Sequence, residues 1–202
     1  FGENSNDYLS ILIGLGNAYA EQGLYEKAEQ IFVKILNNKK NISSENKATT
    51  LNNLGLLYTR LASYDKAAEY LFKGLEIEKE IYGEDSKNIA SNLNNIALNL
   101  KKRGDLKNAK KFILMAINIY EKNNGIKDPL VATSLDNLAL IYQEDGLYTK
   151  AEEKFINALE IKENTYGNKH PSTAISINNL ALNYILQGLN QKAEKLLKKH
   201  LA

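Results

Sequence analysis

The sequence contains few residues that could carry out acid–base or metal chemistry. It has two histidines, His170 and His200, and no cysteine, so a thiolate nucleophile, a disulfide and a cysteine zinc site are excluded. His170 stands directly before a proline, where a helix cap is expected. His200 lies near the end of the sequence, where we expect a solvated helix end. Neither position favours a catalytic residue or a metal ligand.

The carboxylates are spread along the chain at helical spacings, for example from Glu26 to Glu29 and from Glu76 to Glu80, and lysines lie among them. Such spacing is typical of solvated helix faces rather than of paired general acids and bases. The sequence therefore predicts no enzymatic activity, no metal site and no cofactor.

The densest basic cluster is "KKR" at 101–103, which could form a patch with Arg60. Two interpretations stay open: a solvated helix end, favoured by the helix dipole, and a surface for an acidic segment of a partner. The formal net charge of +2 is too small for a nucleic-acid footprint. No apolar run approaches the roughly 18 residues of a membrane-spanning helix. The absence of cysteine favours a cytoplasmic setting.

An internal repeat organises these residues. The segment "ATTLNNLGLLY" at 48–58 recurs with a shift of 42 residues as "ASNLNNIALNL", "ATSLDNLALIY" and "AISINNLALNY", and a divergent copy, "LSILIGLGNAY", lies 39 residues before it. A shorter motif, "YGEDS" at 82–86, recurs as "YGNKH" at 166–170 and resembles the first residues, "FGENS". This resemblance predicts that the chain is cut from a longer array.

Each repeat has the apolar spacing of two amphipathic helices, which we call helix A and helix B. In the second repeat the core positions are Leu51, Leu54, Gly55 and Tyr58 of helix A and Ala67, Leu71, Gly74 and Leu75 of helix B. Because neither helix buries its apolar face alone, the pairs must stack. The sequence predicts an all-α, right-handed superhelical solenoid of five antiparallel helix pairs. It forms a single domain over 1–202, with repeats at about 5–43, 44–85, 86–127, 128–169 and 170–202.

The residues between the helices fit this division. N-caps of helix A are expected at Ser44, Ser86, Asp128 and His170, followed by Pro129 and Pro171 at the first helical position in the last two repeats. Left-handed glycine caps are expected after helix B at Gly83, Gly125 and Gly167, and glycine turns between helices A and B at Gly23, Gly104, Gly146 and Gly188. The second repeat has Ala62 at this turn, where we expect a strained bend.

The pattern resembles the tetratricopeptide repeat, in which a Leu-Gly pair is followed by Tyr, Ala and Phe. The first repeat matches it with Leu15, Gly16, Tyr19, Ala28 and Phe32, and the fourth with Leu138, Ala139, Tyr142, Ala151 and Phe155. The 42-residue period and the "LNNLALxY" helix A resemble the kinesin light chain subclass. This resemblance implies a solenoid whose A helices line a concave groove.

The face of helix A opposite its core positions is the candidate binding surface. It carries rows of asparagine and leucine, and its predicted peptide-binding residues are Asn52, Asn53, Leu56, Asn94, Asn95, Leu98, Lys101, Lys102, Asp136, Asn137, Leu140, Gln143, Asn178, Asn179 and Leu182. Asparagine is a poor helix former, but its amide both donates and accepts hydrogen bonds, which suits the backbone of a peptide. The resemblance to kinesin light chains implies that asparagines at this position hold a linear motif.

Two alternatives remain for these rows: the asparagines bond to one another or to neighbouring A helices, and the leucines pack between A helices. The predicted function is a protein–protein interaction module for a peptide or partner segment, without nucleic acid or membrane. The alternatives are a structural or self-assembly scaffold, and a regulatory sensor array of a larger signalling protein. A homo-oligomer is compatible with the sequence but not indicated by it.

Overall fold

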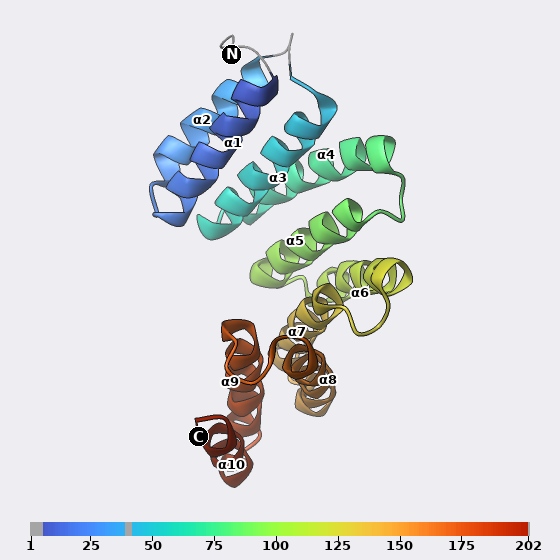
Figure 1. The fold of residues 1–202 in the computed structure, drawn as a ribbon. Coiled ribbons are helices and arrows are strands. Elements are labelled where there is room, and N and C mark those ends of the chain that lie inside the picture. Colours follow the sequence, from blue (N-terminus) through green and yellow to red (C-terminus); the bar gives the residue numbers. More distant parts are fainter. Residues whose placement is uncertain (1–5, 39–41, 202) are drawn as a thin grey trace. The chain divides into compact units, whose positions relative to one another are not determined.

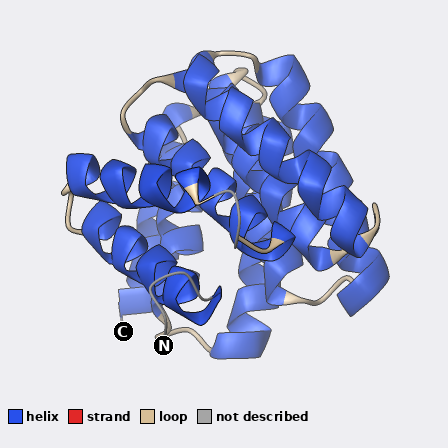
Figure 2. Cartoon of the chain, turned by 90° about the horizontal axis from the view of Figure 1, so that it is seen from above, coloured by secondary structure: helices blue, strands red, loops and turns tan. Residues whose placement is uncertain are grey.

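The computed structural model describes residues 6–38 and 42–201, and this part of the chain contains ten α-helices and no strand (Figures 1 and 2). The helices are α1 (Asn6–Glu21), α2 (Tyr25–Asn37), α3 (Ser44–Arg60), α4 (Tyr64–Tyr82), α5 (Lys87–Arg103), α6 (Leu106–Asn124), α7 (Pro129–Glu144), α8 (Tyr148–Tyr166), α9 (Pro171–Leu186) and α10 (Asn190–Leu201). The all-α prediction is confirmed, and the odd-numbered helices are the predicted A helices. The "FGENS" motif and part of the shortened first repeat lie outside the described residues.

The helices form two compact units, Phe1–Asp105 and Leu106–Ala202, which we call the N-terminal and the C-terminal unit. In the N-terminal unit α3 packs on α1, α2, α4 and α5, and in the C-terminal unit α7 packs on α6, α8 and α9. The boundary lies between α5 and α6. The assignment of all residues to one domain therefore stays a prediction.

Small residues of helix A let helix B approach closely. A Cβ atom added to Gly16 would lie 2.5 Å from the ring of Phe32, and one added to Gly55 would lie 2.4 Å from Leu71 Cγ. All the core positions predicted in the second repeat are buried. The pairing of a small residue on helix A with a large one on helix B therefore gives the first two A–B pairs their close packing.

The predicted N-caps at Ser86, Asp128 and His170 are confirmed: each side chain accepts a hydrogen bond from a backbone N–H of the first turn, at 3.4, 2.8 and 3.1 Å. The prediction of Ser44 is wrong, because Ser43 caps α3 and accepts from the Asn46 N–H at 3.2 Å. The cause is tertiary. Asn6 Oδ1 accepts from the Ser43 N–H at 2.9 Å, and Ser43 is extended there, so the helix starts one residue early.

The three glycines that follow helix B all have positive φ as predicted, but Gly83 and Gly167 are not in the left-handed helical region. Gly83 has φ 76° and ψ 165°, and Gly167 has φ 80° and ψ 170°. Both combine a positive φ with an extended ψ, a region essentially restricted to glycine. The reason is that the chain must leave helix B extended to reach the next N-cap.

The strained bend expected at Ala62 is confirmed: it is the one non-glycine residue of the described chain with positive φ, at 56°. The turn is closed by the Ser63 N–H, which donates to Tyr58 O at 2.9 Å.

We expect Ala62→Gly to stabilise the protein by up to about 1 kcal/mol, because relief of the left-handed strain exceeds the added chain entropy. Urea unfolding followed by circular dichroism measures the change. The control Ala18→Gly, on the exposed face of α1, should destabilise by about 0.5–1 kcal/mol; a loss of stability in both variants would contradict the strain argument.

Candidate functional site

The A-helix face of the N-terminal unit is formed by α1, α3 and α5, with α3 between the other two (Figure 1). On this face Asn53, Asn95, Leu56 and Leu98 are half-buried and Lys102 is exposed. The helices therefore bring the predicted asparagine and leucine rows of this unit onto one surface.

The asparagines of this face differ in what they bond. Asn95 Nδ2 donates to Asn52 Oδ1 at 3.4 Å, so one amide pair joins two A helices. Asn94 Nδ2 donates to a carbonyl of its own helix, Ala90 O, at 3.2 Å. Asn53 Nδ2 is buried and has no hydrogen-bond partner among the described residues. Part of the row thus links helices, as the alternative interpretation expected, whereas Asn53 has a buried donor without a partner among the described residues.

A hollow of about 200 Å³ lies beside Asn53, between α1 and α3. Its lining residues are Asn17, Ala20, Glu21, Asn53, Leu56, Leu57 and Arg60. Arg60 Nη1 donates to Ala20 O at 3.1 Å, near the end of α1. The hollow therefore combines amides, an apolar wall and charges of both signs.

In the C-terminal unit the A-helix face consists of α7 and α9. Asn137, Leu140 and Gln143 of α7 are half-buried, and Gln143 Oε1 is buried without a partner among the described residues. On α9 Asn179 is half-buried, whereas Asn178 is exposed and Leu182 is 47% exposed. Leu182 is therefore more exposed to solvent than Leu56 and Leu98 of the N-terminal unit.

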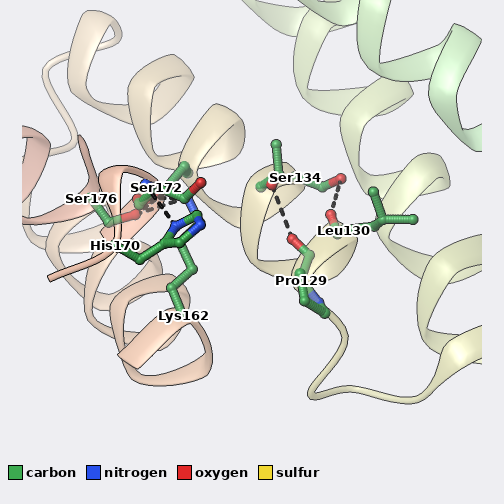
Figure 3. A network of polar contacts seen from close by, with 9 residues as sticks. Pro129, Leu130, Ser134, Lys162, His170, Ser172 and Ser176 are labelled. Atoms are coloured by element: carbon green, nitrogen blue, oxygen red, sulfur yellow. Dashed lines mark hydrogen bonds and ion pairs between the residues drawn. The ribbon is translucent and has the colours of Figure 1, made fainter. Parts of the chain in front are cut away.

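Asp136 belongs to the predicted binding set, but its side chain is only 7% exposed. Its Oδ2 accepts from Lys162 Nζ at 2.6 Å and from Ser176 Oγ at 2.6 Å, which joins α7, α8 and α9. Lys162 also donates to Ser176 Oγ at 3.0 Å and to Ser172 O at 3.4 Å (Figure 3). Burial raises the pKa of Asp136, an effect that the hydrogen bonds from Lys162 and Ser176 oppose. We call Asp136, Lys162 and Ser176 the ionic triad.

A related triad lies 84 residues earlier in the sequence, in the N-terminal unit, where Asn52, Glu78 and Asn92 take the places of Asp136, Lys162 and Ser176. Glu78 accepts from Asn52 Nδ2 at 3.4 Å and from Asn92 Nδ2 at 3.1 Å. Asn92 Nδ2 also lies 3.3 Å from Leu71 O. We call these three residues the amide triad. The same repeat positions therefore form two buried polar clusters of different chemistry.

Sequence reasoning missed Glu78, Asn92, Lys162 and Ser176. One signal could have found part of them: Thr50, Asn92, Ser134 and Ser176 occupy the same position of helix A in successive repeats, all are polar and all are 0% exposed. A buried polar residue needs a hydrogen-bond partner: Thr50 and Ser134 bond to carbonyls of their own helices, whereas Asn92 and Ser176 bond to side chains of other helices. The identity of those partners is visible only after the repeats stack.

The two histidines behave differently. His170 caps α9 as expected and stacks on Tyr166 with a centroid distance of 4.4 Å. The expectation of a solvated position for His200 is wrong, because its side chain is 5% exposed and its Nε2 lies 3.4 Å from Glu163 Oε1. The reason is that α10 packs against α9 and brings His200 near the end of α8.

The basic cluster at the end of α5 is partly neutralised. Arg103 pairs with Asp65 at 3.0 Å and with Asp105 at 3.3 Å, whereas the Lys102 side chain is exposed. Within residues 6–38 and 42–201, no group of three or more potential ligand residues is placed to hold a metal ion. In the same ranges no helix has the length and apolar character needed to cross a membrane.

Comparisons with known proteins relate this geometry to a family. Two family models described as tetratricopeptide repeat match the chain, one over residues 9–41 and the other over 46–122 and 130–202. No curated protein sequence matches it.

Solved structures are similar in fold. BtubC (BKLC) from P. vanneervenii is 24% identical with a TM-score of 0.80, and the match covers 96% of this chain and 77% of that one. The repeats of a putative kinesin light chain from Podospora anserina are 21% identical with a TM-score of 0.78, over 96% and 93% of the two chains. A Rap protein complexed with competence and sporulation factor is 16% identical with a TM-score of 0.80, over 96% of this chain and 52% of that one. The predicted tetratricopeptide-type helical array is confirmed.

Proposed function

Because this chain belongs to the tetratricopeptide-repeat family, we propose that it is a non-catalytic protein-interaction module whose A-helix faces bind an extended peptide segment of a partner. The observation that carries the proposal is Asn53 Nδ2, a buried donor without a partner, at the edge of a hollow that has a leucine in its wall. A buried polar atom of this kind calls for a hydrogen-bond partner.

An extended peptide supplies the missing partner. Each of its residues offers a backbone carbonyl, so the Asn53 amide can donate to it whatever the peptide side chains are. Such a bond contributes about 0.5–1.5 kcal/mol net. Leu56 lines the same hollow, and a peptide side chain placed there would bury apolar surface, at about 25 cal/mol per Å². The amide orients the chain and the leucine adds affinity.

One similar structure supports a binding role for this fold, since that Rap protein is complexed with competence and sporulation factor. This chain spans about half of that protein's length. We leave Asp136 out of the proposed peptide contacts, because its carboxylate already accepts hydrogen bonds from Lys162 and Ser176 inside the protein. The remaining members of the set stay candidate contacts.

The proposal predicts that a peptide selected from a random dodecamer library on the wild-type protein loses at least tenfold in affinity for the Asn53→Ala, Leu56→Ala variant. One hydrogen bond and one apolar contact together amount to about 1.4 kcal/mol or more, which is tenfold in Kd. Isothermal titration calorimetry measures the affinity. The matched control is Asn118→Ala, Leu114→Ala, which removes the same residue types from the exposed face of helix B at α6 and should bind as the wild type does. Equal binding of the first variant and the wild type, or a selection that yields no binder, contradicts the proposal.

A further inference from the structure

A second hollow, of about 150 Å³, lies among α3, α4 and α5 in the N-terminal unit. Its lining residues are Glu45, Ala48, Thr49, Asn52, Glu78, Tyr82, Asn88 and Ser91. Two of them are carboxylates, none is basic, and hydroxyls and amides supply most of the rest. The chemical character of this hollow is therefore that of a site for a positively charged group.

Glu78 is the buried end of the hollow, with 7% of its surface exposed. Its hydrogen-bond donors are the neutral amides of Asn52 and Asn92, and no lysine, arginine or histidine of the described chain forms an ion pair with it. Burial raises the pKa of Glu78, an effect that the two amides only partly offset. A carboxylate has about four lone-pair positions, so Glu78 can accept further hydrogen bonds.

Asn92, which bonds to Glu78 but is not among the residues that line the hollow, is itself incompletely paired. The residue is 0% exposed, and its Oδ1 has no donor among the described residues, although its Nδ2 is bonded to Glu78 and lies near Leu71 O. A buried acceptor without a donor costs about 1–3 kcal/mol. The amide triad therefore has two unmet requirements, a positive charge for Glu78 and a hydrogen-bond donor for Asn92.

The ionic triad shows what meets the first requirement at the equivalent place of the C-terminal unit. There the residue at the Glu78 position is Lys162, and its ammonium group donates to a carboxylate and a hydroxyl contributed by two neighbouring A helices. The protein thus places a lysine ammonium inside one triad and leaves the other with a carboxylate and no cation. The difference lies in the residues at these positions and not in the helical framework, which is repeated.

We propose that the hollow of the amide triad takes the cationic end of a lysine or arginine side chain from the bound partner, with Glu78 as its counter-ion. This inference rests on the proposed function, since Asn52, Thr49 and Ser91 line the hollow from the A helices that would hold the peptide. Glu45, which is exposed, adds a second negative charge at the entrance. The volume is about five times the ~30 Å³ share of one water molecule, enough for the end of a basic side chain.

The test is an NMR titration of the full chain with Nα-acetyl-lysine N-methylamide, read from the side-chain amide signals of Asn52 and Asn92. We expect both signals to shift in a saturable way. The matching norleucine probe, Nα-acetyl-norleucine N-methylamide, keeps the aliphatic side chain without the ammonium group, and it should bind at least tenfold more weakly. Equal shifts with both probes, or no saturable shift with the charged one, overturn the inference.

The second test uses a variant that keeps the fold but places a lysine of the protein itself in the site. The triple substitution Asn52→Asp, Glu78→Lys, Asn92→Ser reproduces the ionic triad, which this protein already accommodates 84 residues later. We expect it to show the circular dichroism spectrum of the wild type and to bind the lysine probe at least tenfold more weakly. Undiminished binding by a folded triple variant shows that the probe binds elsewhere and overturns the inference.

The failure of this inference is distinguishable from failure of the proposed function. Peptides selected on the wild type should contain a lysine or arginine whose replacement by norleucine weakens binding to the wild type at least tenfold. The triple variant should bind the basic peptide and the norleucine peptide equally. Selected peptides that bind without a basic residue refute the cation site alone. Saturable binding of the lysine probe without any selected peptide refutes the peptide-binding function alone.

Discussion

Replacing Lys162 by methionine is expected to lower the free energy of unfolding by about 3–5 kcal/mol at neutral pH, because it leaves a buried carboxylate without its cation. Lys162 and Asp136 have side chains that are 6% and 7% exposed, and Asp136 Oδ1 has no partner among the described residues. After the substitution only Ser176 would donate to Asp136. Urea unfolding followed by circular dichroism measures the loss.

The control is the double variant Lys162→Met, Asp136→Asn, which removes both charges and keeps a hydrogen bond to Ser176. It should lie within about 1 kcal/mol of the wild type or above it, since a buried ion pair contributes little net stability against an apolar replacement. Equal losses in the single and double variants would show that packing of the lysine stem, rather than charge, is what matters.

The loss should also depend on pH. Burial holds the pKa of Asp136 above its ordinary value, and removal of Lys162 raises it further, because the lysine is among the groups that lower it. The unfolded state titrates alike in both proteins, so the charge-dependent part of the Lys162→Met deficit is complete above the folded-state pKa of Asp136 in the variant. It shrinks as pH falls, and it is lost below the lower folded-state pKa of Asp136 in the wild type. A deficit that is constant with pH contradicts the assignment to Asp136.

Replacing Phe155 by alanine is expected to cost about 3–5 kcal/mol of stability, as is usual for a buried phenylalanine. Phe155 is 0% exposed and belongs to the core cluster that contains Ala139 of α7 and Leu180 of α9. Its removal therefore weakens the packing of α8 against both neighbouring A helices. Thermal and urea unfolding of the variant give the change.

The matched control is Phe155→Leu, because the protein itself places Leu71 at the same position of the second repeat, also 0% exposed. We expect this variant to lose less than about 1.5 kcal/mol. A loss as large as that of the alanine variant would mean that the ring shape, and not the filled volume, holds the pair of helices together.

Both predictions concern positions that recur with the repeat but are filled differently. Phe155 and Leu71 fill one apolar position, and Lys162 and Glu78 fill one buried polar position. The helix framework tolerates each change because the partners on the neighbouring helices change with it, as Asp136 does for Lys162. An array of this kind can therefore keep its fold while the chemistry between successive repeats varies, which is what a binding surface for a particular partner requires.

Much of the candidate surface was predictable for the same reason. Asn53, Asn95, Leu56 and Leu98 recur with the period of the repeat, and the structure brings them to the A-helix face of the N-terminal unit. Prediction failed for Asp136, which has the same periodicity but is buried. A helical wheel gives the direction of a side chain relative to its own helix. It does not show which residues of other helices, such as Lys162 and Ser176, pack against that side chain.

The sequence by itself determined the repeat period, the two helices of each repeat, their core positions and most of the caps, because these depend on local propensity and on spacings of three and four residues. The tertiary structure decided which polar residues are paired within the protein and which keep an unpaired atom. Lys162 and Ser176 close over Asp136, whereas Asn53 keeps a free donor and Glu78 has no cation. The physical reason is that the energy of a buried polar group depends on the groups opposite it, and in this fold those groups come from other repeats.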